Sequence, residues 1–504
     1  MNQCFAQTIH RFTTTTHYIT SSSLSSSSRI NRHRATTTTT RRTRNISISA
    51  TNDDINIPEE TDVVIIGGGL AGLAAALELT KRKKSFVLLE ATDEFGGRAR
   101  TEEIDGFLLD VGFAIYLSSY EECARVFDRE ELDLRKFYAG ADVRYERKFY
   151  RVADPFRHVS DALPSLLPEH KIGSTFDKIL VGLVRFQTLL FRMDPLKRLG
   201  GETILERLEK FGFSDLMIDS FFRPFLGGIF FNPELTTDSR LFDFVMRSLA
   251  LGENCLPAKG IGALATQLVS KLNKNTLFLN SKVEEIIENE DDDSSTLSVK
   301  LINGINKTVR AKKIILAVEG PECYRLLGTM SDKSDNNTGG VGTTCVYFSC
   351  DKPYDAKNAI LYLDGELYAR NNRKKTLVNN CCFPSVVSAT YAPEGKHLCS
   401  ASIIGVPEEQ NDELLAEAVK TELSDWFGAD VTKSFKMLKV YRIPFAQPTQ
   451  TPKAKGSGIN AFEQSCESGV MKNVYLAGDH RDAATFDGAL ISGRRCVEYI
   501  IKKP

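Results

Sequence analysis

A glycine-rich turn between an apolar run and an alanine-rich segment constrains this chain more than any other feature. Asp62 to Ile66 is rich in valine and isoleucine, and the turn that follows contains Gly67, Gly69 and Gly72. This order predicts a strand, a tight turn and a helix, with the glycines spaced as in the dinucleotide-binding fingerprint. The amides at the start of the helix, around Ala71, would hold a pyrophosphate.

A second β-branched run, Ser85 to Leu89, ends at Glu90. The distance from Gly72 to Glu90 is close to that of the carboxylate that binds ribose hydroxyls in such folds. An acidic residue at this position disfavours a 2′-phosphate. The ligand is therefore predicted to be FAD or NAD rather than NADP.

The segment Glu94 to Thr101, which contains Gly96, Gly97 and Arg98, follows directly. With it the chain resembles the FAD-dependent amine oxidase and phytoene desaturase superfamily, whose fingerprint continues from the ribose glutamate into Gly-Gly-Arg. The resemblance implies FAD as the cofactor. It also implies that Gly97 and Arg98 approach the flavin diphosphate and ring.

Later segments resemble the same superfamily. Gly478 and Asp479 follow a short apolar run, and the resemblance implies that the aspartate binds the ribityl or phosphate end of FAD. It implies that Val283 meets the adenine through its backbone, and that Gly488 and Ala489 offer helix amides to the flavin. Asp487 stands where the family usually has glutamate. Phe221 to Phe231 resembles a segment that lines the substrate cavity.

The implied fold is α/β, a Rossmann-like FAD-binding domain with an inserted α+β substrate domain. The FAD-binding domain is expected to be discontinuous, and its segments are 61–115, 255–325 and 470–504. The substrate domain is expected to comprise 116–254 and 326–469.

The first 50 residues contain no Asp or Glu and are rich in Arg, Ser and Thr. This composition is typical of an organelle transit peptide, removed near residue 50. The abundance of hydroxyl side chains favours the chloroplast, in the stroma or at the thylakoid or envelope surface, and the mitochondrion is the alternative. A disordered polar tail without a targeting signal also fits the composition.

A helix is predicted over Phe176 to Met193, with Phe176, Ile179, Leu180, Leu183, Val184, Leu190 and Phe191 on one face. Basic residues surround this face, which permits monotopic contact with a membrane surface. The other interpretation is a core helix that covers the substrate cavity. Charged residues interrupt the segment too often for a membrane span.

Composition restricts the partners. The net charge is −1, with 64 Lys and Arg against 65 Asp and Glu, so the chain lacks the basic surplus of a nucleic-acid-binding protein. The eleven cysteines form no CxxC pair, and no metal site is predicted. They are expected to be buried small apolar residues.

Two departures from the family pattern bear on the substrate. Amine oxidases of the superfamily usually place a lysine on the strand near Thr343 to Phe348 and an aromatic residue at the position of Thr485; both are missing here. The resemblance then favours a desaturase-like enzyme that transfers hydride from a hydrophobic plastid metabolite to flavin N5, with a quinone or oxygen as electron acceptor.

Alternatives remain open. They are a flavoprotein amine oxidase, a protoporphyrinogen oxidase-like enzyme, a non-redox carotenoid isomerase and an FAD-holding assembly factor. The sequence identifies no catalytic residue. His480, beside Asp479, is either close to the flavin or a surface or capping histidine.

Overall fold

The computed structural model describes residues 56–190, 194–197, 201–289, 294–301, 303–328, 340–368, 376–452 and 465–502. All of them belong to one compact unit, Asp54–Pro504. The predicted transit peptide lies outside the described residues, so it stays a prediction.

The first of two large sheets is built around the apolar run before the glycine turn. Its strands are β1 (Glu60–Ile66), β2 (Phe86–Leu89), β10 (Leu277–Phe278), β11 (Ser281–Glu288), β12 (Ser295–Leu301), β13 (Asn306–Leu316) and β19 (Val474–Leu476). The order is β10-β2-β1-β13-β12-β11, with β19 paired to β13. β10, β2, β1, β13 and β19 run parallel, whereas β11 and β12 extend β13 as an antiparallel meander. Val64, Ile65 and Ile66 are buried, as expected for parallel strands covered on both faces.

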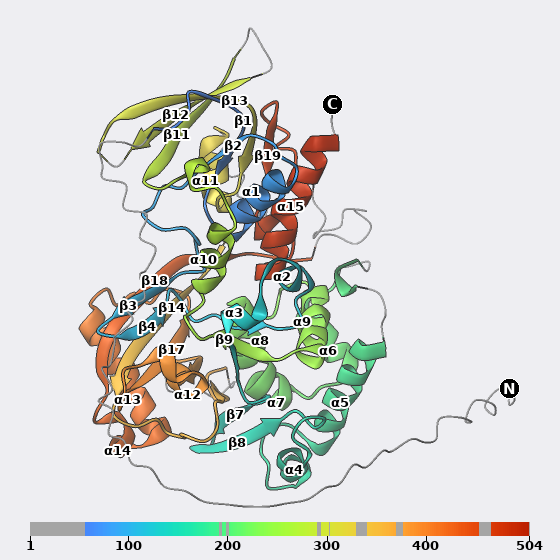
Figure 1. Cartoon of the computed structure of the whole chain (residues 1–504). Coiled ribbons are helices and arrows are strands. Elements are labelled where there is room, and N and C mark those ends of the chain that lie inside the picture. Colours follow the sequence, from blue (N-terminus) through green and yellow to red (C-terminus); the bar gives the residue numbers. More distant parts are fainter. Residues whose placement is uncertain are drawn as a thin grey trace, which may run out of the picture. The chain divides into compact units, whose positions relative to one another are not determined.

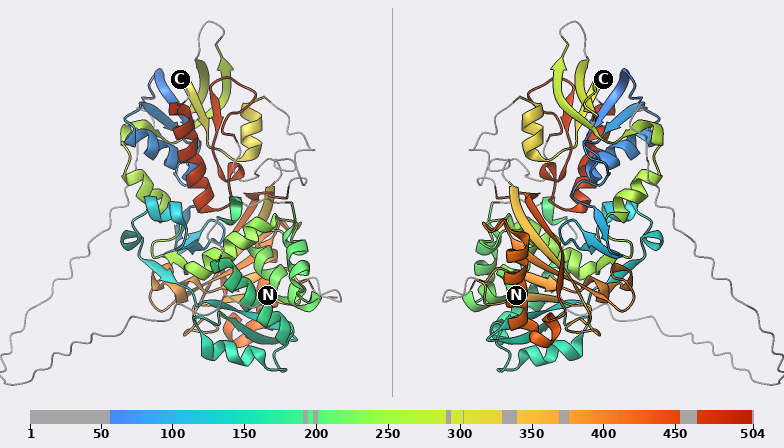
Figure 2. Two further views of the ribbon diagram at one scale, coloured as in Figure 1. Left: turned by 90° about the vertical axis from the view of Figure 1, so that its right-hand side faces the viewer. Right: turned by 90° about the vertical axis from the view of Figure 1, so that its left-hand side faces the viewer.

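Two helices from opposite ends of the described chain pack together against this sheet. They are α1 (Leu70–Lys81) and α15 (Phe486–Lys502), drawn side by side in Figure 1 and again in both views of Figure 2. Gly493 permits this close approach, because a Cβ there would lie 2.1 Å from the carbonyl oxygen of Ala71. α10 (Ala263–Ser270) and α11 (Gly320–Leu326) pack beside α1 and β11.

The second large sheet is mostly antiparallel. Its strands, in the order β18-β14-β17-β16-β15-β7-β8, are β18 (Lys436–Pro448), β14 (Gly340–Cys350), β17 (His397–Ile404), β16 (Asn380–Cys382), β15 (Leu361–Asp364), β7 (Gly140–Tyr145) and β8 (Lys148–Ala153). α12 (Pro384–Val387), α13 (Asp412–Phe427) and α14 (Ala429–Thr432) lie on it (Figure 1). α13 begins after Asn411, whose side chain accepts from the Leu414 amide, and ends at Gly428.

Helices and two small sheets complete the described chain. The helices are α2 (Glu121–Val126), α3 (Arg129–Leu132), α4 (Val159–Ala162), η1 (Leu163–Leu166), α5 (Thr175–Leu190), η2 (Pro195–Lys197), α6 (Ile204–Phe211), α7 (Asp215–Met217), η3 (Ile218–Phe222), α8 (Arg223–Phe230), α9 (Ser239–Leu251), η4 (Lys274–Thr276), η5 (Ala389–Tyr391) and η6 (Asp479–Arg481). β3 (Thr101–Ile104) pairs with β4 (Phe107–Asp110), and β9 (Asn254–Pro257) lies between β5 (Tyr116–Leu117) and β6 (Leu134–Lys136).

The strands of the two large sheets alternate along the chain. Those of the first sheet come from residues 60–89, 277–316 and 474–476, and those of the second from 140–153 and 340–448. This is the alternation that an inserted substrate domain requires. The limits of the two domains stay a prediction, because all described residues form one compact unit.

The orientation of α5 corrects one expectation. Only one edge of its apolar arc faces inward, with Leu180 and Val184 buried beside Asp177 and Thr188. Phe176, Ile179, Leu183 and Leu190 are exposed. Phe191 and Met193 lie outside the described residues. The interpretation of α5 as a cover for the substrate cavity is wrong, because none of its described residues lines that cavity. In the described part of the chain, no helix is both long enough and apolar enough to cross a bilayer.

Candidate functional site

A cavity of about 980 Å³ extends from the glycine turn to the second sheet. Its lining comes from β1, β2 and β11 of the first sheet, from β14, β15, β16 and β18 of the second, and from α8, α9 and the start of α15. Segments from almost the whole described chain therefore converge on one space.

The glycine turn bounds one end of this cavity. Gly67 has φ of +104°, which side-chain-bearing residues rarely adopt. A Cβ on Gly72 would lie 1.9 Å from the Gly67 carbonyl oxygen, so only glycine lets α1 begin this close to the turn. Gly69 faces open space, with no atom within 4 Å of the place of its Cβ. This arrangement leaves room for a phosphate against the first turn of α1.

The Glu90 carboxylate stands beside this turn and is already held in place. Its Oε2 accepts from the Gly68 amide at 2.6 Å, and its Oε1 accepts from the Thr92 amide at 2.9 Å. Oε1 also accepts from the Thr92 hydroxyl at 2.9 Å, whereas Oε2 can still accept a second hydrogen bond. Glu90 lines the cavity, and its Oε2 can therefore receive a ribose hydroxyl while the carboxylate itself stays fixed.

Arg98 and Asp479 form an ion pair at 2.8 Å, although they lie 381 residues apart. Arg98 also donates to the Ala446 carbonyl on β18. Burial alone would raise the pKa of Asp479, but the charge and the hydrogen bond of Arg98 lower it below its usual value. Asp479 is therefore ionised at neutral pH. The pair joins the motif after β2 to the motif after β19.

Val283 lies on β11, at the side of the cavity near Glu90. Arg325 of α11 donates to the carbonyls of Val283 and Glu284, at 3.0 and 2.8 Å. The backbone of this strand is thereby fixed where the resemblance places the adenine.

The N-terminus of α15 forms another wall. Thr485 and Ala489 line the cavity, and the Gly488 amide donates to Thr485 Oγ1 at 3.0 Å. A Cβ on Gly488 would lie 2.0 Å from the Ala483 carbonyl oxygen. Asp487 is buried and accepts from the Cys123 amide at 2.9 Å. Its carboxylate therefore positions α2 against α15.

The twelve residues expected to bind the cofactor fall into two groups. Those that line the cavity are Gly67, Gly69, Ala71, Glu90, Gly97, Arg98, Val283, Gly478, Asp479 and Ala489. Gly72 and Gly488 do not line it and instead permit close packing. His480 is also absent from the lining. Its ring lies over Gly478, and burial lowers its pKa to about 4, although the Asp479 charge acts in the opposite direction.

Arg100 is a lining residue that the motif analysis did not single out. Its Nε is buried and has no hydrogen-bond partner in the described part of the chain. A buried guanidinium donor without a partner is costly. The Arg100 side chain nevertheless adds positive charge to the cavity wall beside Arg98. The only available signal was its place two residues after Arg98.

The half of the cavity nearest the second sheet is lined mainly by apolar side chains, although Thr343, Asn380 and Arg442 of that sheet also line it. Its apolar lining side chains are Phe113, Phe137, Tyr138, Phe225, Ile229, Phe230, Phe231, Val245, Leu249, Leu361 and Leu363. Phe225, Ile229, Phe230 and Phe231 come from the segment that resembles the family's cavity lining. Every carboxylate among the described lining residues lies on the dinucleotide side, as Glu90, Glu319, Glu322 or Asp479.

Asp110 joins the two halves from behind the cavity wall. Its Oδ1 accepts from Thr101 and from the Ile261 amide, and its Oδ2 accepts from Tyr391. Tyr347 of β14 donates to its carbonyl at 2.9 Å. Burial raises the pKa of Asp110 to about 6, although these side-chain hydrogen bonds oppose the shift.

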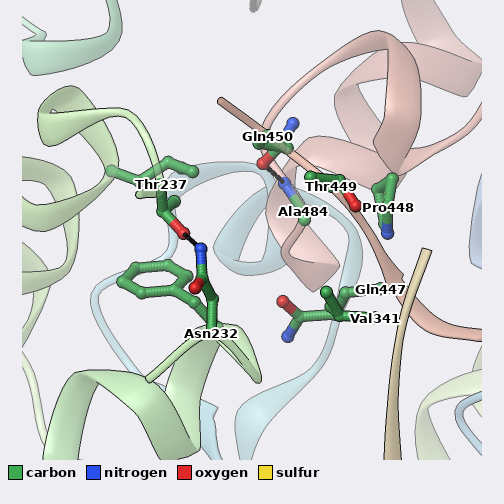
Figure 3. A pocket seen from close by; sticks show the side chains of 10 residues that line it. Asn232, Thr237, Val341, Gln447, Pro448, Thr449, Gln450 and Ala484 are labelled. Carbon is green, nitrogen blue, oxygen red and sulfur yellow. Dashed lines mark hydrogen bonds between the residues drawn. The ribbon is translucent and has the colours of Figure 1, made fainter. Parts of the chain in front are cut away.

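A small polar chamber adjoins the cavity (Figure 3). Its volume is about 10 Å³, enough for one water-sized molecule. Asn232 donates to Thr237 Oγ1, and Gln450 accepts from the Ala484 amide (Figure 3). Because Phe230, Gln447 and Ala484 line both spaces, the chamber is a side recess of the same site.

These features together fit FAD. The glycine turn leaves space against α1, Glu90 retains acceptor capacity at Oε2, and Arg98 and Arg100 line the same region. α15 begins at the wall where the lining of the cavity changes from polar to apolar.

Comparison with known proteins gives the same assignment. A family model described as flavin containing amine oxidoreductase matches residues 70–501. Among curated relatives, a carotenoid 3,4-desaturase of Haloarcula japonica is 39% identical over 74 residues, which are 14% of this chain and 15% of the relative. Polyamine oxidase 3 of rice is 34% identical over 131 residues, 25% and 26% of the two chains. The chain thus matches less than a third of the length of either relative.

Solved structures share the fold. A putative protoporphyrinogen oxidase from Exiguobacterium superposes with a TM-score of 0.64 and 18% identity, covering 88% of this chain and 99% of the other. Putrescine oxidase bound to putrescine superposes with a TM-score of 0.61 and 16% identity over the same shares. At these identities the likeness shows the fold alone. The family model matches most of the length of this chain. The chain therefore belongs to the flavin-containing amine oxidoreductases and is an FAD-dependent oxidoreductase.

Proposed function

We propose that this oxidoreductase dehydrogenates a lipophilic plastid metabolite, and that its electrons pass on to a quinone or to oxygen. When bound, FAD supplies the redox chemistry by accepting a hydride at its N5 atom. The chain itself must bind the substrate, orient one C–H bond and exclude water.

The observation that carries the proposal is the absence of carboxylates from the apolar half of the cavity, among the residues described. A cationic amine or polyamine needs an anionic partner or an aromatic cage when it leaves water. β14 has no lysine, and Thr485 lines the cavity at the position where amine oxidases of the superfamily usually have an aromatic residue. Aromatic and aliphatic side chains instead favour a long apolar molecule.

Particular residues have defined tasks in this proposal. Phe225 stacks on Phe221 with ring centroids 5.4 Å apart, so its face toward the cavity is held in position. Leu361 and Leu363 alternate along β15 and present one apolar face to the same space. Asn380 of β16 offers a polar group at this end and would orient a substrate oxygen.

Two relatives agree with this reading. One is the carotenoid 3,4-desaturase already described. The other is protoporphyrinogen oxidase 2, chloroplastic/mitochondrial, of Arabidopsis thaliana, which is 24% identical over 173 residues, 33% of this chain and 32% of that protein. The first name denotes an enzyme that acts on a carotenoid and the second an enzyme that acts on protoporphyrinogen. The plastid location rests on the composition of the first 50 residues.

The test is an anaerobic stopped-flow screen of the purified holoprotein. Fractions of a plastid lipid extract and, separately, putrescine and spermine are mixed with the protein while the flavin absorption band is followed. We expect one lipid fraction to bleach the flavin and neither polyamine to do so.

Bleaching by a polyamine would overturn the proposal in favour of an amine oxidase. If no fraction bleaches a fully loaded flavin, a non-redox isomerase or an FAD-holding assembly factor becomes the better description. Phe225→Glu is the matched variant. It places a carboxylate in the apolar half and should abolish bleaching by the lipid fraction while FAD stays bound.

A further inference from the structure

A broad apolar surface around α5 is exposed in the described part of the chain. We call it the α5 surface. Its side chains are each 40 to 64% exposed, and they are Phe156, Val159, Leu163, Leu166, Leu167, Phe176, Ile179, Leu183, Phe186, Leu189 and Leu190. Twenty large apolar side chains of the described chain are exposed, and eleven of them gather in this one short stretch. Such a concentration marks an interaction surface.

The spacing on α5 produces a continuous stripe. Phe176, Ile179, Leu183, Phe186 and Leu190 recur every three or four residues and therefore lie on one helical face. η1 lies alongside, because Thr175 Oγ1 donates to the Leu166 carbonyl at 3.3 Å. The leucines of η1 thus widen the stripe into a plane. Figure 1 shows α4 and α5 at the edge of the helical layer.

α5 cannot roll to bury this stripe. On its inner face Asp177 accepts from the amides of Ser174 and Ser214, at 2.6 and 2.8 Å. Near its other end, Arg247 of α9 donates to the Thr188 carbonyl. The helix is therefore fixed at both ends with its apolar stripe facing outward.

The exposed apolar area of the α5 surface exceeds that of the largest apolar patch on an ordinary monomer. Eleven side chains that each expose about half of roughly 200 Å² present on the order of 1,000 Å². Typical largest patches on monomers measure about 300 to 600 Å². Exposure on this scale calls for an apolar partner that covers the whole plane.

Charge at the rim is compatible with phosphate headgroups. Lys171 is exposed between η1 and α5, and Lys178 is held near the surface by its bond to the His170 carbonyl. Asp177 is buried, and Asp161 accepts from the Tyr138 hydroxyl. Glu169 is the one carboxylate between 156 and 190 that is classed as exposed.

We propose that the α5 surface docks on a lipid monolayer, with its apolar side chains among the acyl chains and Lys171 and Lys178 at the phosphates of anionic lipids. A helix pair formed with a second copy along α5 would leave Leu163, Leu166 and Leu167 in water. A planar hydrocarbon layer covers α4, η1 and α5 together.

The surface and the cavity share one structural element. Arg157 donates to the carbonyls of Leu249 and Gly252, at the end of α9, at 2.9 and 2.7 Å. Val245 and Leu249 of the same helix line the cavity. Given this arrangement, we infer that the substrate enters the cavity from the lipid layer, an inference that rests on the proposed function.

The test uses the full-length holoprotein and flotation with vesicles of phosphatidylcholine containing phosphatidylglycerol. We expect the protein to float with the vesicles and the double variant Leu183→Ser, Phe186→Ser to lose at least about tenfold in partition coefficient, from the apolar area removed. The matched control, Leu414→Ser with Ile305→Ser, changes side chains of similar exposure elsewhere (61% and 54%) and should float normally. FAD content and near-UV circular dichroism report folding of every variant.

A second variant tests the lipid charge. Lys171→Glu with Lys178→Glu should weaken binding to the anionic vesicles by about tenfold or more, and should leave the weaker binding to pure phosphatidylcholine unchanged.

Failure of the folded unaltered protein to float would overturn the proposal. So would a dimer in lipid-free sedimentation that the double variant dissociates, because a second copy would then cover the surface. Flavin bleaching by a lipophilic donor in detergent tests the proposed function separately. Bleaching without flotation refutes lipid docking alone, and flotation without bleaching refutes the proposed reaction alone.

Discussion

The two halves of the cavity are bounded by different kinds of groups. On the dinucleotide side, backbone and charge define the wall, through the turn at Gly67 to Gly72, the held carboxylate of Glu90 and the Arg98–Asp479 pair. On the substrate side, the wall consists of apolar side chains from separate helices and strands, such as Phe225, Leu249 and Leu361. Backbone walls tolerate few substitutions, whereas apolar walls can be reshaped one side chain at a time. The first half therefore fixes the cofactor and the second sets the substrate.

The largest expected effect is in the backbone wall. Gly72→Ala places a Cβ 1.9 Å from the Gly67 carbonyl oxygen, which cannot move without opening the turn. We expect destabilisation of about 3 kcal/mol or more and loss of FAD. Thermal unfolding and the flavin-to-protein absorbance ratio measure the two effects. Gly182→Ala on α5, where no atom lies within 4 Å, is the matched control and should stabilise the helix by about 1 kcal/mol. Normal FAD content in Gly72→Ala would show that the backbone wall tolerates substitution as the apolar wall does.

Asp110, at the junction of the halves, should give the next largest effect. Its pKa is raised to about 6 in the folded state from 3.8, so the folded state binds the proton more tightly. Its contribution to the free energy of unfolding is therefore largest below pH 3.8 and falls by about 3 kcal/mol as pH rises to about 6. Urea unfolding of the protein and of Asp110→Asn at a series of pH values isolates this contribution. Identical pH dependence in both proteins would show that the junction carries no buried charge.

The ion pair between the motifs should come third. Arg98→Ala leaves the buried Asp479 carboxylate without its partner, and burial then raises its pKa. We expect a loss of about 2 kcal/mol at pH 7, reduced from a fully buried pair because Arg98 is 38% exposed. The free energy of unfolding of the variant should rise as pH falls from 7 to 5, because the unpaired Asp479 then becomes protonated. In the unaltered protein the ion pair has the opposite dependence, since its contribution is lost when Asp479 becomes protonated at more acidic pH. The double variant Arg98→Ala, Asp479→Asn should remove this inverted pH dependence.

The smallest effect is expected in the apolar wall. Phe225→Ala should weaken binding of the lipophilic dye Nile red by about tenfold, because one cavity-lining aromatic ring is lost. The affinity for FAD should stay within twofold. Energy transfer from the bound flavin to the dye measures the first quantity, and FAD fluorescence titration measures the second. Leu414→Ala, far from the lining, is the control. A large loss of FAD affinity in Phe225→Ala would mean that the two halves are not separable.

Local patterns predicted the dinucleotide half because its parts are contiguous in sequence. Strand, turn and helix occupy Glu60–Lys81 without interruption, and Glu90 follows in the next strand. The ends of α13 likewise depend on near neighbours, because Asn411 caps its start and Gly428 ends it.

Other parts depend on contacts between distant segments, which no local pattern contains. The sequence analysis identified the motifs of Arg98 and Asp479. It did not predict that these two residues form an ion pair with each other. Leu249 and Leu361 share a cavity only because the fold brings α9 and β15 to the same space. For α5, the sequence defined an apolar arc, whereas the rotation of that arc was set by Asp177 and its bonds to Ser174 and Ser214.

The pairing of β13 has a consequence for the order in which the protein assembles. β1 leaves the ribosome first, yet its partner β13 follows more than 240 residues later, and β19 later still. The early strand–turn–helix unit must persist without its sheet during synthesis, exposing Val64 and Ile66 to chaperones. Arg98 meets Asp479 only when the last helix is being made. Cofactor capture is thus a late event of folding, and a chain cut before β19 should not retain FAD.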